Sequence, residues 1–304
     1  MLSDDVRRYV ALQRGLGLKF NEQSRTLLQL ASYAEAHGDQ HTRTDRIYDW
    51  CRSASSQLRA RTCFDTARRF CVFVAAEDPR HQVPPAGAFG RGRRPRPAPH
   101  LLEPQHVRAI MDAALDLPPS GTISPHTYHH LFGLLAATGL RISEALALQR
   151  DDLTDDGLVV RSGKFAKSRL LPIHPTTRQA LERYLAIRDR LSPAGGDLFV
   201  VTTGRPPHKT TVYLVFRRLA HQLGLRGLGR TPGPRLHDLR HTFAVRSLEA
   251  CGHDRQAVAS HMLALSTYLG HADVAHTYWY LQATPVLLRD IAAAGEDLFQ
   301  GKAA

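Results

Sequence analysis

The chain has 304 residues, which is longer than one hydrophobic core usually spans and suits two domains. Its hydrophobic content of 43% and charged content of 22% are those of ordinary globular proteins and exclude a largely disordered chain. The formal net charge of +12 favours a polyanionic partner, nucleic acid above all. No apolar run is long enough to cross a bilayer, and the N-terminus lacks the pattern of a secretory signal. We therefore expect a cytoplasmic, nucleoid-associated protein with no membrane partner.

Residues 1–78 are expected to form a small helical domain. Apolar residues recur at helical spacing near residues 3–14, 22–37, 44–58 and 60–76. The segment 79–100 is rich in proline, glycine and arginine, so we interpret it as an interdomain linker. Its basic side chains are expected to follow the phosphate backbone of DNA, namely Arg91, Arg93, Arg94 and Arg96.

Residues 101–284 are expected to form a second domain that is mainly helical and contains one small antiparallel sheet. The segment DDGLVVRSGKFAKSRLLPI alternates and turns like a hairpin or small meander. In the C-terminal segment 285–304 a final helix is predicted at 285–299 and followed by a tail, with the helix either packed on its own domain or docked on a neighbouring protomer. The other predicted helices are 103–116, 126–138, a short one from Ser143, 175–191, 209–223, 237–251, 254–260 and a less regular stretch at 263–269.

Lysine is scarce among the basic residues. Only five of the 40 basic side chains are lysine, and Lys164 and Lys167 lie close together in SGKFAKSR. In a chain that uses arginine so heavily, a retained lysine indicates that its own chemistry is needed. The segment is therefore a candidate functional loop.

Three other segments combine cations with groups that transfer protons or attack as nucleophiles. Arg141 lies between two predicted helices, so its guanidinium and the free N–H groups of the second helix can meet on one anion. His237 and Arg240 are three residues apart on one helix face. His271 precedes Tyr280 by nine residues, and a tyrosine becomes a nucleophile where cations stabilise its phenolate. Each segment alone also fits a structural role.

Taken together and in this order, the motifs resemble those of the tyrosine recombinase or phage integrase family. They are TGLRISEAL, then GKFAKSRLLP, then HDLRHTF, then LGH with a tyrosine nine residues later. The resemblance covers residues 100–282 by motif. It implies a helical N-terminal core-binding domain that binds DNA, followed in the chain by an integrase-like catalytic domain. The ending TYWYL resembles that of transposon-encoded members, some of which act together with related recombinases.

The resemblance implies roles for the cationic residues. Arg141 and Arg240 would hold the non-bridging oxygens of the scissile phosphate. Lys164 would protonate the leaving 5′ oxygen, while Lys167 and Arg169 would contact DNA. These residues would supply the positive charge that the transition state requires.

The resemblance also assigns the proton transfers and the nucleophile. Tyr280 would attack phosphorus and form a 3′-phosphotyrosyl bond, His237 would manage its proton, and His271 would hydrogen-bond the phosphate. Tyr278 and Tyr268 are rival nucleophiles. The nine-residue spacing from LGH favours Tyr280.

The implied reaction needs no cofactor, because the phosphotyrosine conserves the bond energy and the arginines supply the charge. The sequence contains no Walker loop, no HExxH motif and no carboxylate cluster suited to Mg²⁺. A zinc site at His126, His129 and His130 is not favoured, because no cysteine or carboxylate completes it. The expected partners are double-stranded DNA recombination sites, further copies of the chain in a tetramer on DNA, and related recombinases.

Two other functions stay open at this point. A degenerate relative would bind DNA as an architectural or regulatory protein, and it would lack some of the motif residues. A topoisomerase-like enzyme would nick and close DNA by the same chemistry while acting alone. All motif residues are present, and tetramer formation on DNA would separate a recombinase from a topoisomerase.

Overall fold

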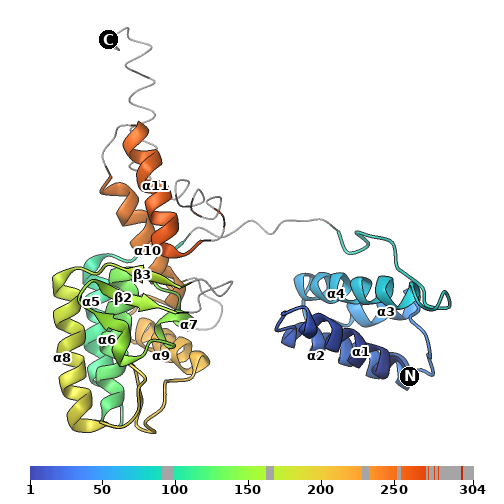
Figure 1. The fold of residues 1–304 in the computed structure, drawn as a ribbon, viewed down its shortest axis with the longest axis horizontal. Helices are drawn as coiled ribbons and strands as arrows, with labels where there is room; N and C mark the ends of the chain where they lie inside the picture. Colours follow the sequence, from blue (N-terminus) through green and yellow to red (C-terminus); the bar gives the residue numbers. More distant parts are fainter. Residues whose placement is uncertain are drawn as a thin grey trace. The chain divides into compact units, whose positions relative to one another are not determined.

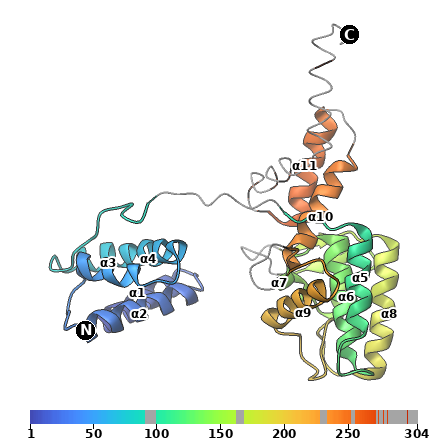
Figure 2. The same ribbon diagram turned by 180° about the vertical axis from the view of Figure 1, so that it is seen from behind.

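The computed structural model describes residues 1–90, 99–161, 168–227, 233–251, 255–271, 273, 277, 280 and 296. The chain divides into two compact units, Met1–Arg96 and Pro97–Ala304, which are drawn from two sides in Figures 1 and 2. The division lies inside the segment predicted as a linker. Within the described residues, no helix combines the length and apolar character that a membrane span requires.

The N-terminal unit is a bundle of helices around two adjoining apolar clusters. Its helices are α1 (Leu2–Gly15), α2 (Asn21–Ala36), α3 (Thr44–Arg52) and α4 (Gln57–Ala75). Helix α4 begins at Ser56, whose side chain accepts a hydrogen bond from the Arg59 N–H, as a good N-cap does. Its buried residues include Phe70 and Val74 in one cluster and Phe64 in the other, so this helix joins the two.

Part of the predicted linker belongs to the N-terminal unit. Phe89 packs on Phe64 with 5.1 Å between ring centroids, and Arg68 Nε donates to the Pro84 carbonyl at 3.0 Å. His81 is buried as well. Proline and glycine content correctly predicts irregular backbone here, but the apolar ring of Phe89 anchors this backbone to the helices. The segment 79–90 is therefore a packed loop.

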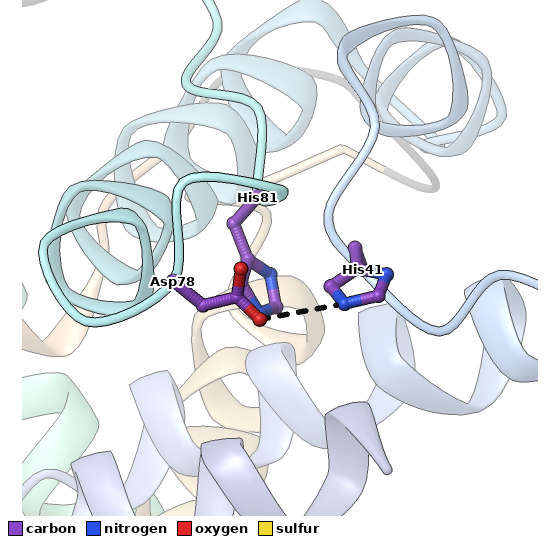
Figure 3. Close-up of side chains that lie close together, drawn as sticks. All are labelled: His41, Asp78 and His81. Carbon is purple, nitrogen blue, oxygen red and sulfur yellow. Dashed lines mark ion pairs between the residues drawn. The ribbon is translucent and has the colours of Figure 1, made fainter.

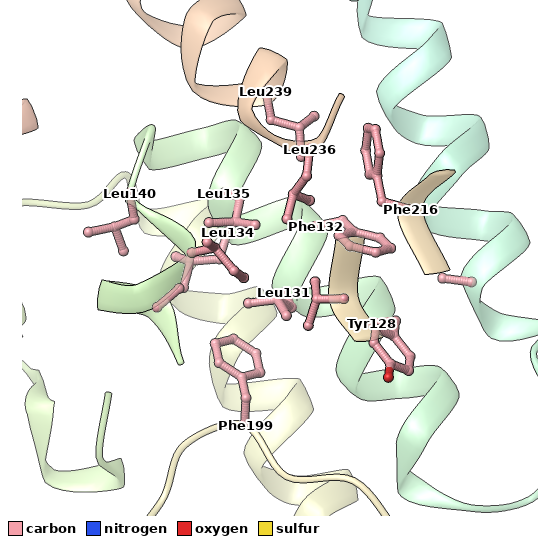
Figure 4. Packing of buried hydrophobic residues seen from close by; sticks show 14 of the residues in the cluster. Tyr128, Leu131, Phe132, Leu134, Leu135, Leu140, Phe199, Phe216, Leu236 and Leu239 are labelled. Atoms are coloured by element: carbon pink, nitrogen blue, oxygen red, sulfur yellow. The ribbon is translucent and has the colours of Figure 1, made fainter. Parts of the chain in front are cut away.

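The second unit is built around α6 (Ile123–Thr138), which is buried along much of its length. Figure 4 shows Leu131, Phe132 and Leu135 of α6 among side chains from other elements, such as Phe216. Phe132 and Phe216 meet edge to face with 5.5 Å between centroids. The helices of this unit are α5 (Pro104–Leu115), α6 (Ile123–Thr138), α7 (Ile142–Ala145), α8 (Pro175–Leu191), α9 (Lys209–Gln222), α10 (Leu236–Glu249) and α11 (Arg255–Leu269), with a 3₁₀ turn at Arg150–Asp152.

A small antiparallel sheet accompanies these helices, as the sequence predicts. Its strands are β1 (Leu153–Thr154), β2 (Gly157–Val160) and β3 (Arg169–Leu171), in the order β1-β2-β3. Val160 pairs with Arg169 at the end of the β2–β3 ladder. The meander and the predominance of helix confirm the predicted fold class. The loop between β2 and β3 carries Lys164 and Lys167, and both lie outside the described residues.

Helices α10 and α11 pack through their own apolar cluster. Val245 and Leu248 of α10 meet Leu265 and Leu269 of α11, and Tyr280 joins the same cluster. Helix α11 is one continuous helix where the sequence predicts two shorter stretches. The predicted helix 285–299 falls outside the described residues except for Glu296.

Candidate active site

The C-terminal end of α11 is the centre of the candidate site. The last four carbonyls of an α-helix have no partner inside the helix, and the helix dipole makes this end attractive to cations. In α11, the first two of the four accept backbone N–H groups from Gly270 and His271. The Tyr268 and Leu269 carbonyls that remain, and the Gly270 carbonyl after them, each accept a hydrogen bond from a different arginine.

Arg240 is the most deeply buried of these arginines, with 3% of its surface exposed. Its Nη2 donates to the Leu269 carbonyl at 2.8 Å and to His271 Nε2 at 2.9 Å. Its Nη1 donates to the carbonyl of Gly139, the residue that ends α6, at 2.6 Å. The pKa of Arg240 is lowered to about 10, first by burial and second by the charge of Arg141, while Tyr280 opposes both effects. The guanidinium therefore stays charged at neutral pH, held between two helix ends.

Arg141 is the second arginine of the motif and is more accessible, with 25% of its side chain exposed. It stands at the N-cap of α7, two residues after Gly139, the glycine that ends α6. Its Nη2 donates to the Gly270 carbonyl at 2.9 Å, and its Nη1 donates to Glu144 Oε1 at 2.7 Å. The backbone N–H of Arg141 also donates to Glu144 Oε2 at 3.1 Å. Glu144 thus fixes both the backbone and the side chain of Arg141.

Glu144 is a buried carboxylate shared by two arginines. Its side chain is 5% exposed and pairs with Arg141 and with Arg169 Nη2, the latter at 3.0 Å. Burial alone would raise the pKa of Glu144, but the hydrogen bonds and charge of Arg169, and then the bonds of Arg141, lower it below its usual value. The carboxylate is therefore ionised at neutral pH.

His271 connects Arg240 to the segment that carries Tyr280. Because Arg240 can only donate, His271 Nε2 accepts, and the proton of the neutral ring lies on Nδ1. That Nδ1 lies 2.7 Å from Thr277 Oγ1 and donates to it. The rings of His271 and Tyr280 are nearly parallel, with an interplanar angle of 16° and centroids 6.2 Å apart.

Tyr280, the tyrosine that the nine-residue spacing favours as the nucleophile, lies beside Arg240. Its side chain is buried, with 3% exposed, and a hydrogen bond to Tyr280 is among the effects that raise the pKa of Arg240. The ring of His241 lies 5.6 Å from that of Tyr280. The candidate nucleophile therefore touches the cation that would stabilise its phenolate.

His237 and His241 extend this group along α10. Their rings meet edge to face at 4.5 Å. Loss of hydration lowers the pKa of His237, and the charge of Arg240 lowers it further, although the side chain reaches solvent. Burial lowers the pKa of His241 to about 4. Both rings are therefore neutral at pH 7, and the exposed one is available as a base.

Comparisons with known proteins identify the family and the fold. Residues 100–285 match the model of the phage integrase family. The chain belongs to this family. An integrase/recombinase of Sinorhizobium fredii, y4rB, is 36% identical over 94% of each chain, and the tyrosine recombinase XerC of Pseudomonas aeruginosa is 32% identical over 64% of this chain and 59% of its own. A lambda integrase tetramer bound to a Holliday junction has the same fold, with a TM-score of 0.65 and 18% identity over 92% of this chain and 76% of the integrase.

Membership of the phage integrase family makes the chain a tyrosine recombinase, as the motifs predict. Of the residues that the motifs single out, the structure brings together Arg141, Arg240, His271 and Tyr280, with His237 beside them on α10. Several others lie outside the described residues, namely Lys164, Lys167, Arg91, Arg93, Arg94, Arg96 and the rival nucleophile Tyr278. Their roles stay predictions.

Two residues that the sequence analysis considers, Arg169 and Tyr268, have structural contacts with other parts of the protein. The sequence predicts Arg169 as a DNA contact, but its guanidinium faces Glu144 and the Tyr268 carbonyl and is 16% exposed. The hydroxyl of Tyr268, the other rival nucleophile, donates to the Pro172 carbonyl at 3.1 Å, and its ring stacks on Phe243. Both side chains join α11 to neighbouring elements.

Sequence reasoning missed Glu144, His241 and Gly270 as parts of the site. Each lies inside a motif of the integrase family, so a signal was present, but no role followed from the spacing alone. Glu144 is three residues after Arg141 at a helix start, where an acidic side chain commonly caps the backbone. Contacts from distant elements decide the roles of the other two.

The histidines that crowd α6 act as packing residues. His129 Nδ1 lies 2.9 Å from the Met111 carbonyl, and His130 Nδ1 lies 2.8 Å from the His126 carbonyl. The ring of His130 also packs on Tyr184 at 5.1 Å. These contacts connect both rings to the backbone and to the core.

Among the described residues, one group of side chains lies close enough to hold a metal ion: His41, Asp78 and His81 of the N-terminal unit (Figure 3). Its contacts argue against that use. The Thr42 N–H donates to His81 Nδ1 at 3.1 Å, so the other nitrogen of the neutral ring carries the proton. The Asp78 carboxylate already binds the Arg80 guanidinium at 2.8 Å and pairs with His41 Nε2 at 3.5 Å. We interpret the group as a structural contact that connects the loop before α3 to the turn after α4.

The Gly139 position yields a test of how tightly the site is packed. Gly139 has φ +61°, and a Cβ there would lie 2.6 Å from Phe243 and 2.9 Å from Leu269. Gly121 has φ +74° with open space around it and is the matched control. We expect Gly139→Ala to lower the free energy of unfolding of the second unit by about 1–3 kcal/mol more than Gly121→Ala does, because both share the backbone strain and only one overpacks. Pulse proteolysis in urea, quantified on peptides of residues 99–161, measures the difference. Equal losses would contradict the close packing.

Proposed function

We propose that the chain cleaves and rejoins DNA at specific sites through a 3′-phosphotyrosyl bond formed by Tyr280. The observation that carries the proposal is the contact of the buried Tyr280 with Arg240, beside Arg141 and His271 in one connected network. A tyrosine packed against a charged guanidinium is suited to ionise, and two arginines side by side are suited to a phosphodiester.

In this mechanism the two arginines bind the non-bridging oxygens of the scissile phosphate. Arg141 is the more exposed and would meet the phosphate first. Arg240 would bind the phosphate while it still contacts the tyrosine, which brings the Tyr280 oxygen near phosphorus. Because helix-end carbonyls already orient Arg240, little reorganisation is needed when charge develops in the transition state.

The chemical step is a transesterification in which atoms and charges balance. The Tyr280 oxygen forms a bond to phosphorus, the bond from phosphorus to the 5′ oxygen breaks, and Lys164 gives that oxygen a proton. His237, neutral at pH 7, takes the proton of the tyrosine. Attack by a DNA 5′ hydroxyl reverses these steps and restores the tyrosine. The phosphotyrosine conserves the bond energy, so the reaction requires no nucleotide hydrolysis, and the arginines provide charge that a metal would otherwise provide.

The role of His271 follows from its tautomer. With Nδ1 donating to Thr277 and Nε2 accepting from Arg240, the neutral ring has no donor left for a phosphate. We therefore assign it first the task of orienting Arg240. A hydrogen bond from His271 Nε2 to the phosphate would require either a second ring proton or a shift of the ring proton from Nδ1 to Nε2, together with release of Arg240.

We further propose that the chain acts as a homotetramer on double-stranded DNA, as the lambda integrase does on a Holliday junction. The helical N-terminal unit and the second unit would both bind the DNA duplex, and the linker arginines would contact the phosphate backbone of the DNA. The C-terminal segment 285–304 would dock on the next protomer. Cooperation with related recombinases stays a prediction from the TYWYL ending. A silent DNA-binding relative is disfavoured by the connected site, and a topoisomerase-like enzyme would not need the tetramer.

Tyr280→Phe tests the nucleophile. On DNA from the neighbourhood of the gene, nicked to trap the intermediate and kept in EDTA, wild type should form a covalent adduct on a denaturing gel. Tyr280→Phe should form none, because it lacks the attacking oxygen, while Tyr278→Phe should retain the adduct. Loss of the adduct only in Tyr278→Phe would identify Tyr278 as the nucleophile. Tight DNA binding without any adduct in wild type would refute the proposed chemistry.

The pH dependence of cleavage tests His237 as the base. The pKa of His237 is lowered from 6.5, so the neutral ring persists throughout the range above pH 6.5. The single-turnover cleavage rate at pH 6.5 should therefore exceed half of its rate at pH 8 and fall further at lower pH, as the ring gains a proton. His237→Asn should cleave about 10²–10⁴-fold more slowly and lose this acid limb. An unchanged limb in His237→Asn would assign the titration to another group.

A further inference from the structure

Arg169 is a half-buried arginine at the first position of β3, and its contacts are with protein. Its Nη2 and Nη1 reach the two oxygens of Glu144 at 3.0 Å and 3.3 Å, and its Nε donates to the Tyr268 carbonyl at 3.0 Å. Two parallel N–H···O bonds to a carboxylate form a bidentate pair, the strongest and most directional ion pair available to arginine.

Gly270 makes room for this guanidinium. A Cβ at Gly270 would lie 2.7 Å from Arg169 Nη1 and 2.9 Å from its Cζ, and the backbone has φ +64°. The carbonyl of the same glycine accepts a hydrogen bond from Arg141 at 2.9 Å. Arg169 and Arg141 therefore both lie against Gly270 and share Glu144. The glycine of the LGH motif is required by space as well as by backbone conformation.

Arg169 also fixes the strand on which it lies. Its backbone pairs with Val160 at the end of the β2–β3 ladder. Val160 precedes the segment that carries Lys164, and Arg169 follows it. Beyond the other end of β3, the Pro172 carbonyl accepts the Tyr268 hydroxyl at 3.1 Å. Two bonds thus connect β3 and its exit to the last turn of α11. Arg169 joins three parts of the site: the strand after the lysine loop, the helix start at Arg141, and the turn at His271.

We propose that Arg169 is a positioning residue that holds Arg141, through Glu144, in the orientation required for DNA cleavage. The inference rests on the proposed function. Without Arg169, Glu144 keeps a buried negative charge with one guanidinium partner instead of two, and the carboxylate loses the bond pair that fixes its plane. Arg141 then loses a defined orientation at its Nη1 and at its backbone N–H. Misplacement of a transition-state group by about 1 Å costs a rate factor on the order of 10².

The test compares Arg169→Gln and Arg169→Lys with a matched control, Arg178→Gln. Arg178 of α8 is also a half-buried arginine, and its Nη2 donates to the Thr154 carbonyl and, at 2.8 Å, to the Asp155 carbonyl beside β1. Among the residues that the structure describes, these partners are not part of the site. For each variant, affinity for DNA and the single-turnover rate of adduct formation at saturating protein are measured on the nicked substrate, with the melting temperature as a folding control.

Both Arg169 variants should bind DNA within about threefold of wild type and form the adduct about 10²-fold more slowly, while Arg178→Gln should stay within about twofold on both measures. Arg169→Lys keeps the charge but has no fork to span both Glu144 oxygens, so it should not rescue the rate. If Arg169→Gln does not fold, Arg169→Lys carries the test alone.

The pH profile adds a readout that a purely structural role would not move. Arg169 is the main partner that lowers the pKa of Glu144, so its loss should raise that pKa. Adduct formation by Arg169→Gln should therefore show a new acid limb, and Glu144→Gln in the same background should remove that limb.

Three outcomes would overturn the inference. A wild-type rate in Arg169→Gln would show that the bridge is unnecessary. A loss of DNA affinity as large as the loss of rate would make Arg169 a DNA contact, and full rescue by lysine would reduce it to a counter-charge. Failure of wild type itself to form an adduct would instead refute the proposed function.

Discussion

The site depends on the hydrogen bonds that the backbone carbonyls at the C-terminal end of α11 accept. A helix end leaves acceptors that must find donors, and a buried arginine has donors that must find acceptors. Here the two needs are met together, because consecutive carbonyls from Tyr268 to Gly270 receive three guanidinium groups. Burying Arg240 without such partners would cost several kcal/mol. The helix end therefore makes a cluster of positive charge stable inside the protein.

That cluster explains why residues far apart in sequence are arranged as they are. Glu144 adds the one negative charge that two neighbouring arginines share, and it is held ionised by them. Gly139 and Gly270 bring backbone carbonyls to the guanidinium groups and leave space where a side chain would collide with neighbours. Tyr280 is buried next to the cluster, beside the charge that its ionised form would need.

Periodicity and spacing predict much of this from sequence, because helices and the small meander are set by local patterns. The alternation around Leu158 and the apolar repeat of α6 lead directly to elements that the structure contains. Contacts across long separations could not be predicted. The direction of the Arg169 side chain is set by the Tyr268 carbonyl, 99 residues later, so its basic character alone suggested a DNA contact. Phe89 likewise turns part of a predicted linker into a packed loop.

The contacts at the C-terminal end of α11 orient Arg141, Arg169 and Arg240 before DNA arrives. Nuclear magnetic resonance of the DNA-free full chain, labelled with ¹⁵N in arginine, tests this orientation directly, with signals assigned through the single variants Arg141→Lys, Arg169→Lys and Arg240→Lys. We expect separate Nη signals and slow Nε–H exchange for Arg240 and Arg169, and for Arg141 at least a restrained Nε–H, all without DNA. Averaged, rapidly exchanging signals that become restrained only when DNA is added would contradict it.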